Sequence, residues 1–479
     1  MATPIPANRC VFQASEIVSA TGALFSGDSS LQITGVSIDT RSIEPGGLFV
    51  ALRGVRDGHE FLESAARAGA AAAIVERGRR HMSLPTFEVD DTLGALGALA
   101  CHHLRRIRSA SSLPIIAIGG AVGKTTTKEF AAAAMSALFG EVLATPGNLN
   151  NLIGVPMTVL TLTGKHRAVV LECGTNQRGE IRRLSDILTP DIALVLNADI
   201  EHTEGLGSLE GVADEEAELF ARAHCAIISD SEELLRVRIP AGMRTMKFGA
   251  EPDADVQVVF RSTQSGGQQI KLRLAAWMVD SALSPYLDTT LNLIGEPIAQ
   301  NAAAAVLAAG VAWGRPLGSQ EIAAIGRALA SVKGEPGRLS TRELNGIVVI
   351  DDTYNANPRS VRAALSAARQ TADMLQARLV VALGDMLELG ELSRAMHVAA
   401  VREVFAVRPD EFIAVGCEFI AAVKQLLEEG SMALKPCLAR DSMEAAALVL
   451  SIIRRGDVLL LKGSRGIAME RVIDRLSAR

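Results

Sequence analysis

The sequence lacks the features that mark a disulfide-stabilised, nucleic-acid-binding or exported protein. Its six cysteines are scattered and form no C-x-x-C pair, so neither a disulfide framework nor a zinc site is indicated. A formal charge of −6 disfavours nucleic acid as the main partner, because a surface that follows phosphates is normally basic. The N-terminal segment has no basic region followed by an apolar run, so no signal peptide and a cytoplasmic location are expected.

Long uncharged runs are also scarce. One of them, 297–314, is mostly alanine and contains Gln300 and Asn301, which favours a packed helix of a soluble protein over a membrane span. No membrane insertion is therefore expected. The run Cys101-His102-His103 has no second ligand cluster nearby, so a core or surface role is favoured over metal binding.

Length and composition breaks predict three domains. The chain has 479 residues, too many for one ordinary core. Small residues and a proline at 108–114, and the glycine–proline segment 333–337, are typical of linkers. The predicted domains are 1–110, 111–333 and 334–479.

The periodicity of apolar residues predicts an α/β protein. In the first domain we expect a small α/β unit with a helix at 61–68 and strands at 31–38, 47–52 and 71–75. The central domain should hold a mostly parallel sheet with helices on both faces. Its expected strands are 115–118, 168–172 and 192–197, followed by an antiparallel region at 246–293. The third domain should be Rossmann-like, with strands at 348–350, 379–383, 412–415 and 458–461.

A glycine turn between a buried strand and a helix is the most informative motif. Residues 115–129 read I-I-A-I-G-G-A-V-G-K-T-T-T-K-E, in which backbone N–H groups can surround phosphate oxygens. Lys124 would neutralise the β- and γ-phosphates, and the Thr125 hydroxyl would reach Mg²⁺. Ile118 stands where the strict G-x-x-x-x-G-K-[ST] loop has glycine, so the spacing is the shorter G-x-x-G-K-T-T. The residues expected to bind ATP here are Gly120, Ala121, Val122, Gly123, Lys124, Thr125 and Thr126.

Other polar groups follow further strands. Glu172 ends an apolar strand, where a carboxylate is costly to bury unless a cation accompanies it. His202 follows a second such strand. Together with Thr125, these side chains suit Mg²⁺ or Mn²⁺ beside nucleotide phosphates. A hydrogen-bonded loop histidine is the alternative for His202.

The third domain carries groups able to close over a nucleotide. Arg338 can contact phosphate and Asp352 can accept from ribose hydroxyls. Lys462 and Arg465 lie on a glycine–serine turn suited to anions. Surface solvation explains any one of them alone, but their joint placement at strand ends favours a site.

Taken together, these segments resemble the Mur ligase family along nearly the whole chain. The matching segments are DTR at 39–41, GLFVALRG at 47–54, DGHEF at 57–61, GKTTTKE at 123–129, PGNLNNLIGVP at 146–156, ECGTNQRGEI at 172–181, HTEGLGSLEGVA at 202–213, DDTYNANP at 351–358, GDMLELG at 384–390 and KGSR at 462–465. DDTYNANP and GDMLELG are typical of the branch that joins D-Ala-D-Ala to UDP-MurNAc-tripeptide.

The resemblance implies a reaction and its participants. ATP would phosphorylate the terminal carboxylate of UDP-MurNAc-tripeptide, and the amine of D-Ala-D-Ala would attack the acyl phosphate. ATP and Mg²⁺ are the implied cofactors, these small molecules the implied partners, and a monomer the implied state. A related ligase with another amino-acid acceptor, and a catalytically lapsed nucleotide-binding regulator, remain alternatives.

The resemblance also implies site residues. Lys124, His202 and Glu216 would be catalytic, and Thr125, Glu172 and His202 would bind metal. Further nucleotide contacts would be Asn301, Arg338, Asp352 and Asn355. The UDP moiety would face Ser37, Asp39 and Arg41. The remaining substrate contacts would be Asn148, Asn150, Asn151, Thr175, Asn176, Asn357, Lys462 and Arg465.

Two departures from the family pattern stand out. Glu216 occupies the position where most members carry a carbamylated lysine, and there is no lysine between Lys165 and Lys247. We hypothesise that Glu216 supplies the negative charge directly, helped by Glu215 or by water. A shifted helix, a looser second metal, or a solvated acidic helix face are the alternatives. The second departure is G-E-P-I-A-Q-N at 295–301, where the family usually has G-R-H-N-x-x-N.

Overall fold

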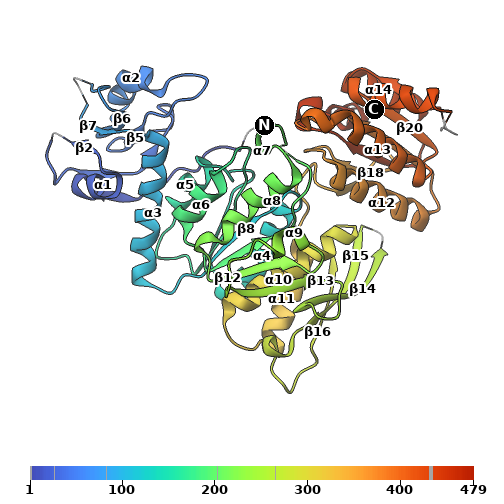
Figure 1. Ribbon diagram of the computed structural model, residues 1–479, viewed down its shortest axis with the longest axis horizontal. Helices are drawn as coiled ribbons and strands as arrows, with labels where there is room; N and C mark the ends of the chain where they lie inside the picture. Colours follow the sequence, from blue (N-terminus) through green and yellow to red (C-terminus); the bar gives the residue numbers. More distant parts are fainter. Residues whose placement is uncertain are drawn as a thin grey trace.

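Three α/β units follow one another along the chain (Figure 1). A computed structural model of the protein describes residues 3–25, 27–81, 84–201, 203–264, 266–430 and 435–478. The three large sheets fall within 24–89, 115–291 and 340–462. The domain limits at 110 and 333 stay a prediction.

The N-terminal unit is built on a five-stranded sheet in the order β2-β7-β6-β5-β4. Its strands are β2 (Leu24–Phe25), β4 (Val36–Ser37), β5 (Leu48–Val50), β6 (Ala72–Glu76) and β7 (Thr86–Val89). Helices α1 (Ala14–Thr21) and α2 (Leu62–Arg67) belong to the same unit. The pair β1 (Val11–Gln13) and β3 (Gln32–Thr34) forms a separate two-stranded sheet.

One predicted strand of this unit is wrong. The segment 31–38 does not form a single strand but divides at Gly35, whose φ of +84° breaks the extended run. The residues before Gly35 join β3 and those after it join β4, so the two halves belong to different sheets.

Helix α3 (Thr92–Ala110) connects the N-terminal unit to the central unit (Figure 1). It packs against α1 on one side and against α5 (Gly154–Val159) and α6 (Glu180–Leu188) on the other. Arg106 donates to Val11 O at 2.8 Å, and Arg108 donates to Thr189 O at 3.0 Å. The helix is therefore bonded to both units.

The central unit contains a nine-stranded sheet in the order β16-β15-β14-β13-β12-β11-β8-β10-β9. Its strands are β8 (Ile115–Gly119), β9 (Val142–Ala144), β10 (Ala168–Glu172), β11 (Ile192–Val195), β12 (Cys225–Ser229), β13 (Arg244–Gly249), β14 (Val256–Gln264), β15 (Gly267–Leu274) and β16 (Tyr286–Leu291). The pairings from β9 to β14 are parallel, and β14, β15 and β16 are antiparallel. The antiparallel region predicted from residue 246 is thus wrong at its start, since β13 pairs in parallel with both neighbours.

Helices cover both faces of this sheet. They include α4 (Lys124–Phe139), α5, α6, α7 (Thr203–Leu206), α8 (Leu209–Ala217), α9 (Glu233–Arg236), α10 (Glu296–Trp313) and α11 (Ser319–Ser331). The alanine-rich run predicted to be a packed helix is α10, whose side chains are buried from Asn301 to Gly310. It packs against α4 and the sheet. In the part of the chain that the structure describes, no helix has both the length and the apolarity to cross a membrane.

The C-terminal unit has a six-stranded sheet in the order β17-β18-β22-β19-β20-β21. The strands are β17 (Ser340–Leu344), β18 (Ile347–Asp352), β19 (Leu379–Gly384), β20 (Glu411–Val415), β21 (Cys437–Ala439) and β22 (Val458–Lys462). Only β17 pairs in the antiparallel sense, as expected for a Rossmann-like sheet with one added edge strand. The helices are α12 (Pro358–Leu375), α13 (Ser393–Ala406), α14 (Cys417–Glu428), α15 (Ser442–Ile452) and α16 (Glu470–Ser477).

Strand order explains why the site forms where it does. In the central sheet β8 lies between β11 and β10, so the polar residues after these three strands meet at one edge. In the C-terminal sheet β22 lies between β18 and β19, and the segments that follow them meet in the same way.

Candidate active site

The turn between β8 and α4 needs glycine at two positions. Gly120 has a φ of +117° and Gly123 a φ of +94°, which other residues rarely adopt. A Cβ on Gly120 would lie 3.0 Å from the backbone nitrogens of Leu196 and Asn197. A Cβ on Gly123 would lie 2.9 Å from Asn301 Oδ1. The turn is therefore fixed by its packing as well as by its conformation.

Asn197, directly after β11, holds this turn in place. Its side chain accepts from Val122 N and donates to Val122 O, both at 2.8 Å. Its backbone oxygen accepts from Ala121 N at 3.0 Å. Asn197 is not among the residues predicted from the sequence to form the site. Its position as a lone amide at the end of an apolar strand was the available signal.

Lys124 begins α4, and its ammonium group turns back onto the loop. Nζ donates to Gly120 O and lies 3.6 Å from Glu201 Oε1. Burial by itself lowers the pKa of Lys124, but the carboxylates of Glu201, Glu216 and Glu172 raise it above its ordinary value. Lys124 is therefore a permanent positive charge at neutral pH.

Two of the three predicted metal ligands lie together. Thr125 Oγ1 donates to Glu172 Oε2 at 2.8 Å, and Asn150 Nδ2 donates to the other oxygen of Glu172 at 2.8 Å. Glu172 is 1% exposed. His202, the third predicted ligand, lies outside the described residues. Within those residues no cluster of three histidine, cysteine or acidic side chains suits a metal. A hydroxyl and a carboxylate are nevertheless the hard oxygen donors that Mg²⁺ prefers, so Thr125 and Glu172 fit that ion.

Glu216 lies on α8, beneath the same turn. It is 1% exposed, and its Oε2 accepts from Gly120 N at 2.6 Å. Burial raises the pKa of Glu216 to about 7, and the charge of Glu201 adds to this effect while Lys124 opposes it. The interpretation of this segment as a solvated acidic face is wrong for Glu216. Of the three successive acidic residues Asp214, Glu215 and Glu216, only Asp214 is exposed.

Glu215, suggested above to help Glu216, is hydrogen-bonded to another helix. Its two oxygens accept from Gly179 N at 2.7 Å and from Ile181 N at 2.8 Å. These N–H groups belong to the first turn of α6, where a carboxylate is favoured. Glu215 therefore caps α6, and Glu216 alone faces the phosphate loop.

At the C-terminal sheet, two predicted ligand contacts bind each other. Lys462 Nζ donates to Asp352 Oδ2 at 2.5 Å and to Asn355 O at 2.8 Å. Lys462 is 1% exposed and Asp352 is 8% exposed. Arg338 stacks on the ring of Tyr354, 3.9 Å from its centroid. In this arrangement Asp352 and Lys462 form a structural ion pair.

The first turn of α12 carries several of the polar contacts between the C-terminal and central units, and a further hydrogen bond at 3.0 Å joins Arg261 of β14 to Gln370 further along the helix. Asn357 Nδ2 donates to Glu201 Oε2 at 3.3 Å, while its Oδ1 caps α12 by accepting from Ser360 N at 2.8 Å. Arg359 donates to Glu232 Oε1 at 2.7 Å. Asn357, predicted to face substrate, thus lies within reach of the phosphate loop through Glu201.

The remaining predicted substrate residues are dispersed. Ser37, Asp39 and Arg41 cluster in the N-terminal unit, where the Arg41 guanidinium pairs with Asp39 at 2.6 Å. Asn151 caps α5 by accepting from Gly154 N at 2.8 Å, and Thr175 Oγ1 donates to Gln177 O at 2.8 Å. The exposed residues among them are Asn148, Asn151, Asn176, Asn355 and Arg465. Among Asn148, Asn150, Asn151, Thr175 and Asn176, only Asn150 has a hydrogen bond to Thr125 or Glu172, the two predicted metal ligands that the structure describes.

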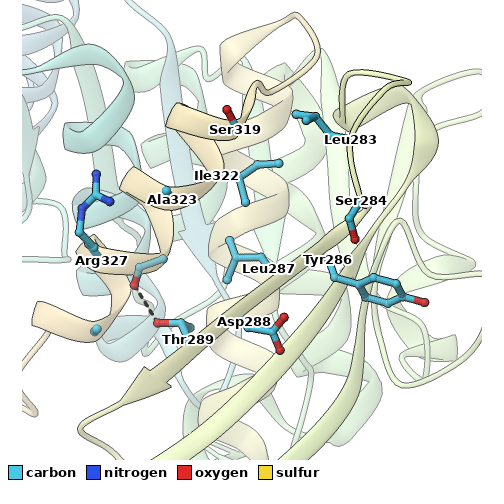
Figure 2. A pocket seen from close by; sticks show the side chains of 12 residues that line it. Leu283, Ser284, Tyr286, Leu287, Asp288, Thr289, Ser319, Ile322, Ala323 and Arg327 are labelled. Atoms are coloured by element: carbon cyan, nitrogen blue, oxygen red, sulfur yellow. Dashed lines mark hydrogen bonds between the residues drawn. The ribbon is translucent and has the colours of Figure 1, made fainter.

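A second hollow lies between β16 and α11 (Figure 2). Its volume is about 530 Å³, and Leu287, Ile322 and Arg327 are among its lining residues. Thr289 Oγ1 donates to Gly326 O at 2.8 Å across it. It is remote from the phosphate loop, because β15, β14, β13, β12 and β11 separate β16 from β8. We assign it no role in the site.

The fold and the loop define a class: a multidomain phosphate-loop protein whose C-terminal α/β unit docks beside the loop of the central unit. Three family models match the chain. They are the Mur ligase middle domain at 118–309, the Mur ligase glutamate ligase domain at 337–465 and the Mur ligase catalytic domain at 32–103. The chain belongs to the Mur ligase family.

Individual relatives are similar over nearly their full length. The UDP-N-acetylmuramoyl-tripeptide–D-alanyl-D-alanine ligase of Escherichia coli is 34% identical, with 93% of this chain and 94% of the relative covered. The enzyme of the same name from Bacillus subtilis is 32% identical, with 92% of each covered. A crystal structure of MurF from Acinetobacter baumannii superposes with a TM-score of 0.87 at 29% identity, covering 98% of this chain and 100% of that one. MurF from Thermotoga maritima in complex with ADP gives 0.79 at 26% identity, covering 92% and 97%.

Proposed function

We propose that this protein is an ATP-dependent ligase that joins D-Ala-D-Ala to UDP-MurNAc-tripeptide in the cytoplasm. The terminal carboxylate of the tripeptide attacks the γ-phosphorus of ATP, giving an acyl phosphate and ADP. The amine of D-Ala-D-Ala then attacks the acyl carbon, an amide bond forms and phosphate leaves. The observation that carries the proposal is the cluster of Lys124 with the buried Thr125 and Glu172 at the phosphate loop of a chain similar to ligases of this name.

Each loop residue has a task in this reaction. The backbone N–H groups of 120–126 and the Lys124 ammonium bind the β- and γ-phosphates and neutralise charge as the phosphoryl group moves. Thr125 and Glu172, with His202, would hold Mg²⁺, which supplies further positive charge at the γ-phosphate when bound. Asn301, packed against Gly123, is proposed to contact the adenine.

The C-terminal unit would complete the site by excluding water from the acyl phosphate. Arg338, Asp352 and Asn355 are proposed to contact the nucleotide. Lys462, Arg465, Asn357 and the central residues Asn148, Asn150, Asn151, Thr175 and Asn176 are proposed to contact the peptide substrates. Ser37, Asp39 and Arg41 would contact the UDP moiety. We propose a monomer as the working unit, with no nucleic-acid partner and no membrane insertion.

Glu216 is proposed to supply directly the negative charge that a carbamylated lysine supplies elsewhere in the family. Its burial and its bond to Gly120 place it beneath the loop. After removal of bicarbonate at acidic pH, the ligase rate measured above pH 7, where Glu216 is ionised, should be unchanged, while Glu216→Ala should lower it at least about tenfold. A fully active Glu216→Ala would contradict this role.

Phosphate release from purified protein tests the function. ATP and UDP-MurNAc-tripeptide are supplied with D-Ala-D-Ala or with single amino acids, and Lys124→Ala serves as the inactive control. We expect turnover only with D-Ala-D-Ala. Turnover with a single amino acid would instead indicate a related ligase, and no substrate-dependent turnover would indicate a lapsed regulator.

A further inference from the structure

Glu201 has no role in the site described above, although it touches two of its parts. It lies in the loop after β11 and is 8% exposed. Oε1 lies 3.6 Å from Lys124 Nζ, and Oε2 accepts from Asn357 Nδ2 at 3.3 Å. A single buried carboxylate therefore joins the lysine of the phosphate loop to the first turn of α12.

The loop that carries Glu201 is held from both sides. Glu201 N donates to Asp199 O at 2.8 Å, and the Asp199 carboxylate lies 3.9 Å from Arg359 of α12. Earlier in the same loop, Asn197 makes its hydrogen bonds to the turn at 121–122. The segment 197–201 thus bridges the phosphate loop and the C-terminal unit, with Glu201 at the point where both meet.

The negative charge of Glu201 determines how its contact with Lys124 affects nucleotide binding. Lys124 faces Gly120 O and Glu201, and phosphate oxygens would take it from both partners. The Glu201 carboxylate would then lie close to phosphates of the same sign, where repulsion is poorly screened because the group is buried. Nucleotide binding is therefore opposed as long as Glu201 stays where the docked C-terminal unit holds it.

We propose that Glu201 is a positioning residue that keeps Lys124 withdrawn while the C-terminal unit is docked in the arrangement seen here, which differs from the arrangement that would close over a bound nucleotide. Nucleotide binding displaces Glu201, and Asn357 passes that displacement to α12. Because one carboxylate serves both contacts, docking and nucleotide binding must affect each other by equal amounts. The inference rests on the proposed function, in which ATP occupies the loop.

ADP affinity, measured by titration calorimetry, tests the charge. Glu201→Gln removes the charge but keeps an acceptor for Asn357, so ADP should bind roughly three- to tenfold more tightly, with or without Mg²⁺. Glu204→Gln, which removes an exposed charge three residues away, should leave the affinity unchanged. Unchanged or weaker binding by Glu201→Gln overturns the proposal, and weakening only with Mg²⁺ would make Glu201 a metal ligand instead.

Small-angle scattering tests the coupling. The wild-type profile should shift on addition of ADP, whereas Glu201→Ala should bind ADP without that shift. A shift equal to that of the wild type overturns the proposal, and Glu201→Gln provides a second variant if the alanine variant does not fold. Failure of the wild type to bind ADP would refute the proposed function itself, so the two failures are distinguishable.

Discussion

Single residues around the phosphate loop carry more negative than positive charge. Glu172, Glu201 and Glu216 all surround Lys124, and each of these carboxylates is at most 8% exposed. An excess of buried carboxylates is costly unless cations or protons compensate it. The site is therefore electrostatically prepared for a cation, and its stability should depend on pH.

The raised pKa of Glu216 determines whether its contribution to stability rises or falls with pH. Its pKa in the folded protein is about 7, against an ordinary value of 4.5, so the fold favours its protonated form. The folded state binds more protons than the unfolded state between these values, and the contribution to stability is lost as pH rises from about 4.5 to about 7. Glu216→Gln should thus raise the free energy of unfolding at pH 8, by on the order of 1–3 kcal/mol.

The measurement is urea denaturation of wild type and variant at pH 8 and near pH 4. The two proteins should differ at pH 8 and converge at pH 4, where Glu216 is protonated in both states. A difference of the same size at both pH values would contradict the raised pKa.

At the scale of elements, the positions of several strands and of the glycine turn could be predicted from the sequence. Apolar runs with glycine or polar ends predicted β8, β10 and β19 within one residue of their observed limits. Partner choice was harder to predict, because local pattern does not say which sheet a short strand joins. The division at Gly35 and the parallel pairing of β13 depend on long-range packing that periodicity does not contain.

Side-chain partners in the site were predictable only in part. Thr125 and Glu172 lie together because Thr125 follows β8, Glu172 ends β10, and these two strands are neighbours in a parallel sheet. The bonds of Asn197 to the turn, the capping of α6 by Glu215 and the pairing of Asp352 with Lys462 depend on side-chain geometry between elements far apart in sequence. Residue type alone marks such groups as polar without naming their partners.

The hydrogen bonds of Asn197, which connect the end of β11 to the phosphate loop, should contribute to ADP affinity. Asn197→Ala removes two hydrogen bonds at 2.8 Å, each contributing about 1 kcal/mol, so ADP affinity should fall on the order of tenfold or more. Asn292→Ala, at an exposed amide near the surface of the same unit, is the matched control. If calorimetry showed that both variants bind ADP like the wild type, Asn197 would not be needed to hold the phosphate loop in its binding conformation.

The ends of β18 and β22 are joined by a buried ion pair whose halves depend on each other. Lys462→Met leaves Asp352 buried without its cation, which should cost about 3–5 kcal/mol of stability. Adding Asp352→Asn should recover much of that loss, since the uncompensated charge is removed. Chemical denaturation of both variants is the check, and equal stability of the single and double variants would argue against the pair.

At the scale of the whole molecule, polar contacts at the start of α12 tie the C-terminal unit to the centre. Arg359 reaches Glu232, whose side chain is 9% exposed, and Asn357 reaches Glu201. These polar contacts add to the Arg261–Gln370 hydrogen bond and to the packing of α12 against α10 and β14 in holding this arrangement of the two units.

Arg359→Ala should therefore loosen the C-terminal unit without unfolding it. We expect a larger radius of gyration in solution scattering and an unchanged circular dichroism spectrum. Arg362→Ala, which removes an exposed arginine on the same helix paired only within the C-terminal unit, should leave the radius unchanged. An unaltered radius in Arg359→Ala would mean that other contacts fix the arrangement.

Helix α3, in contrast, joins the N-terminal and central units rigidly. Its 19 residues form a rod of roughly 28 Å, pinned to the N-terminal unit by Arg106 and to the central unit by Arg108. A hinge there would have to break both anchors and expose the apolar face of the rod. The N-terminal and central units should therefore move as one body, so the distance between two spectroscopic labels placed on either side of α3 should stay constant when ligands bind.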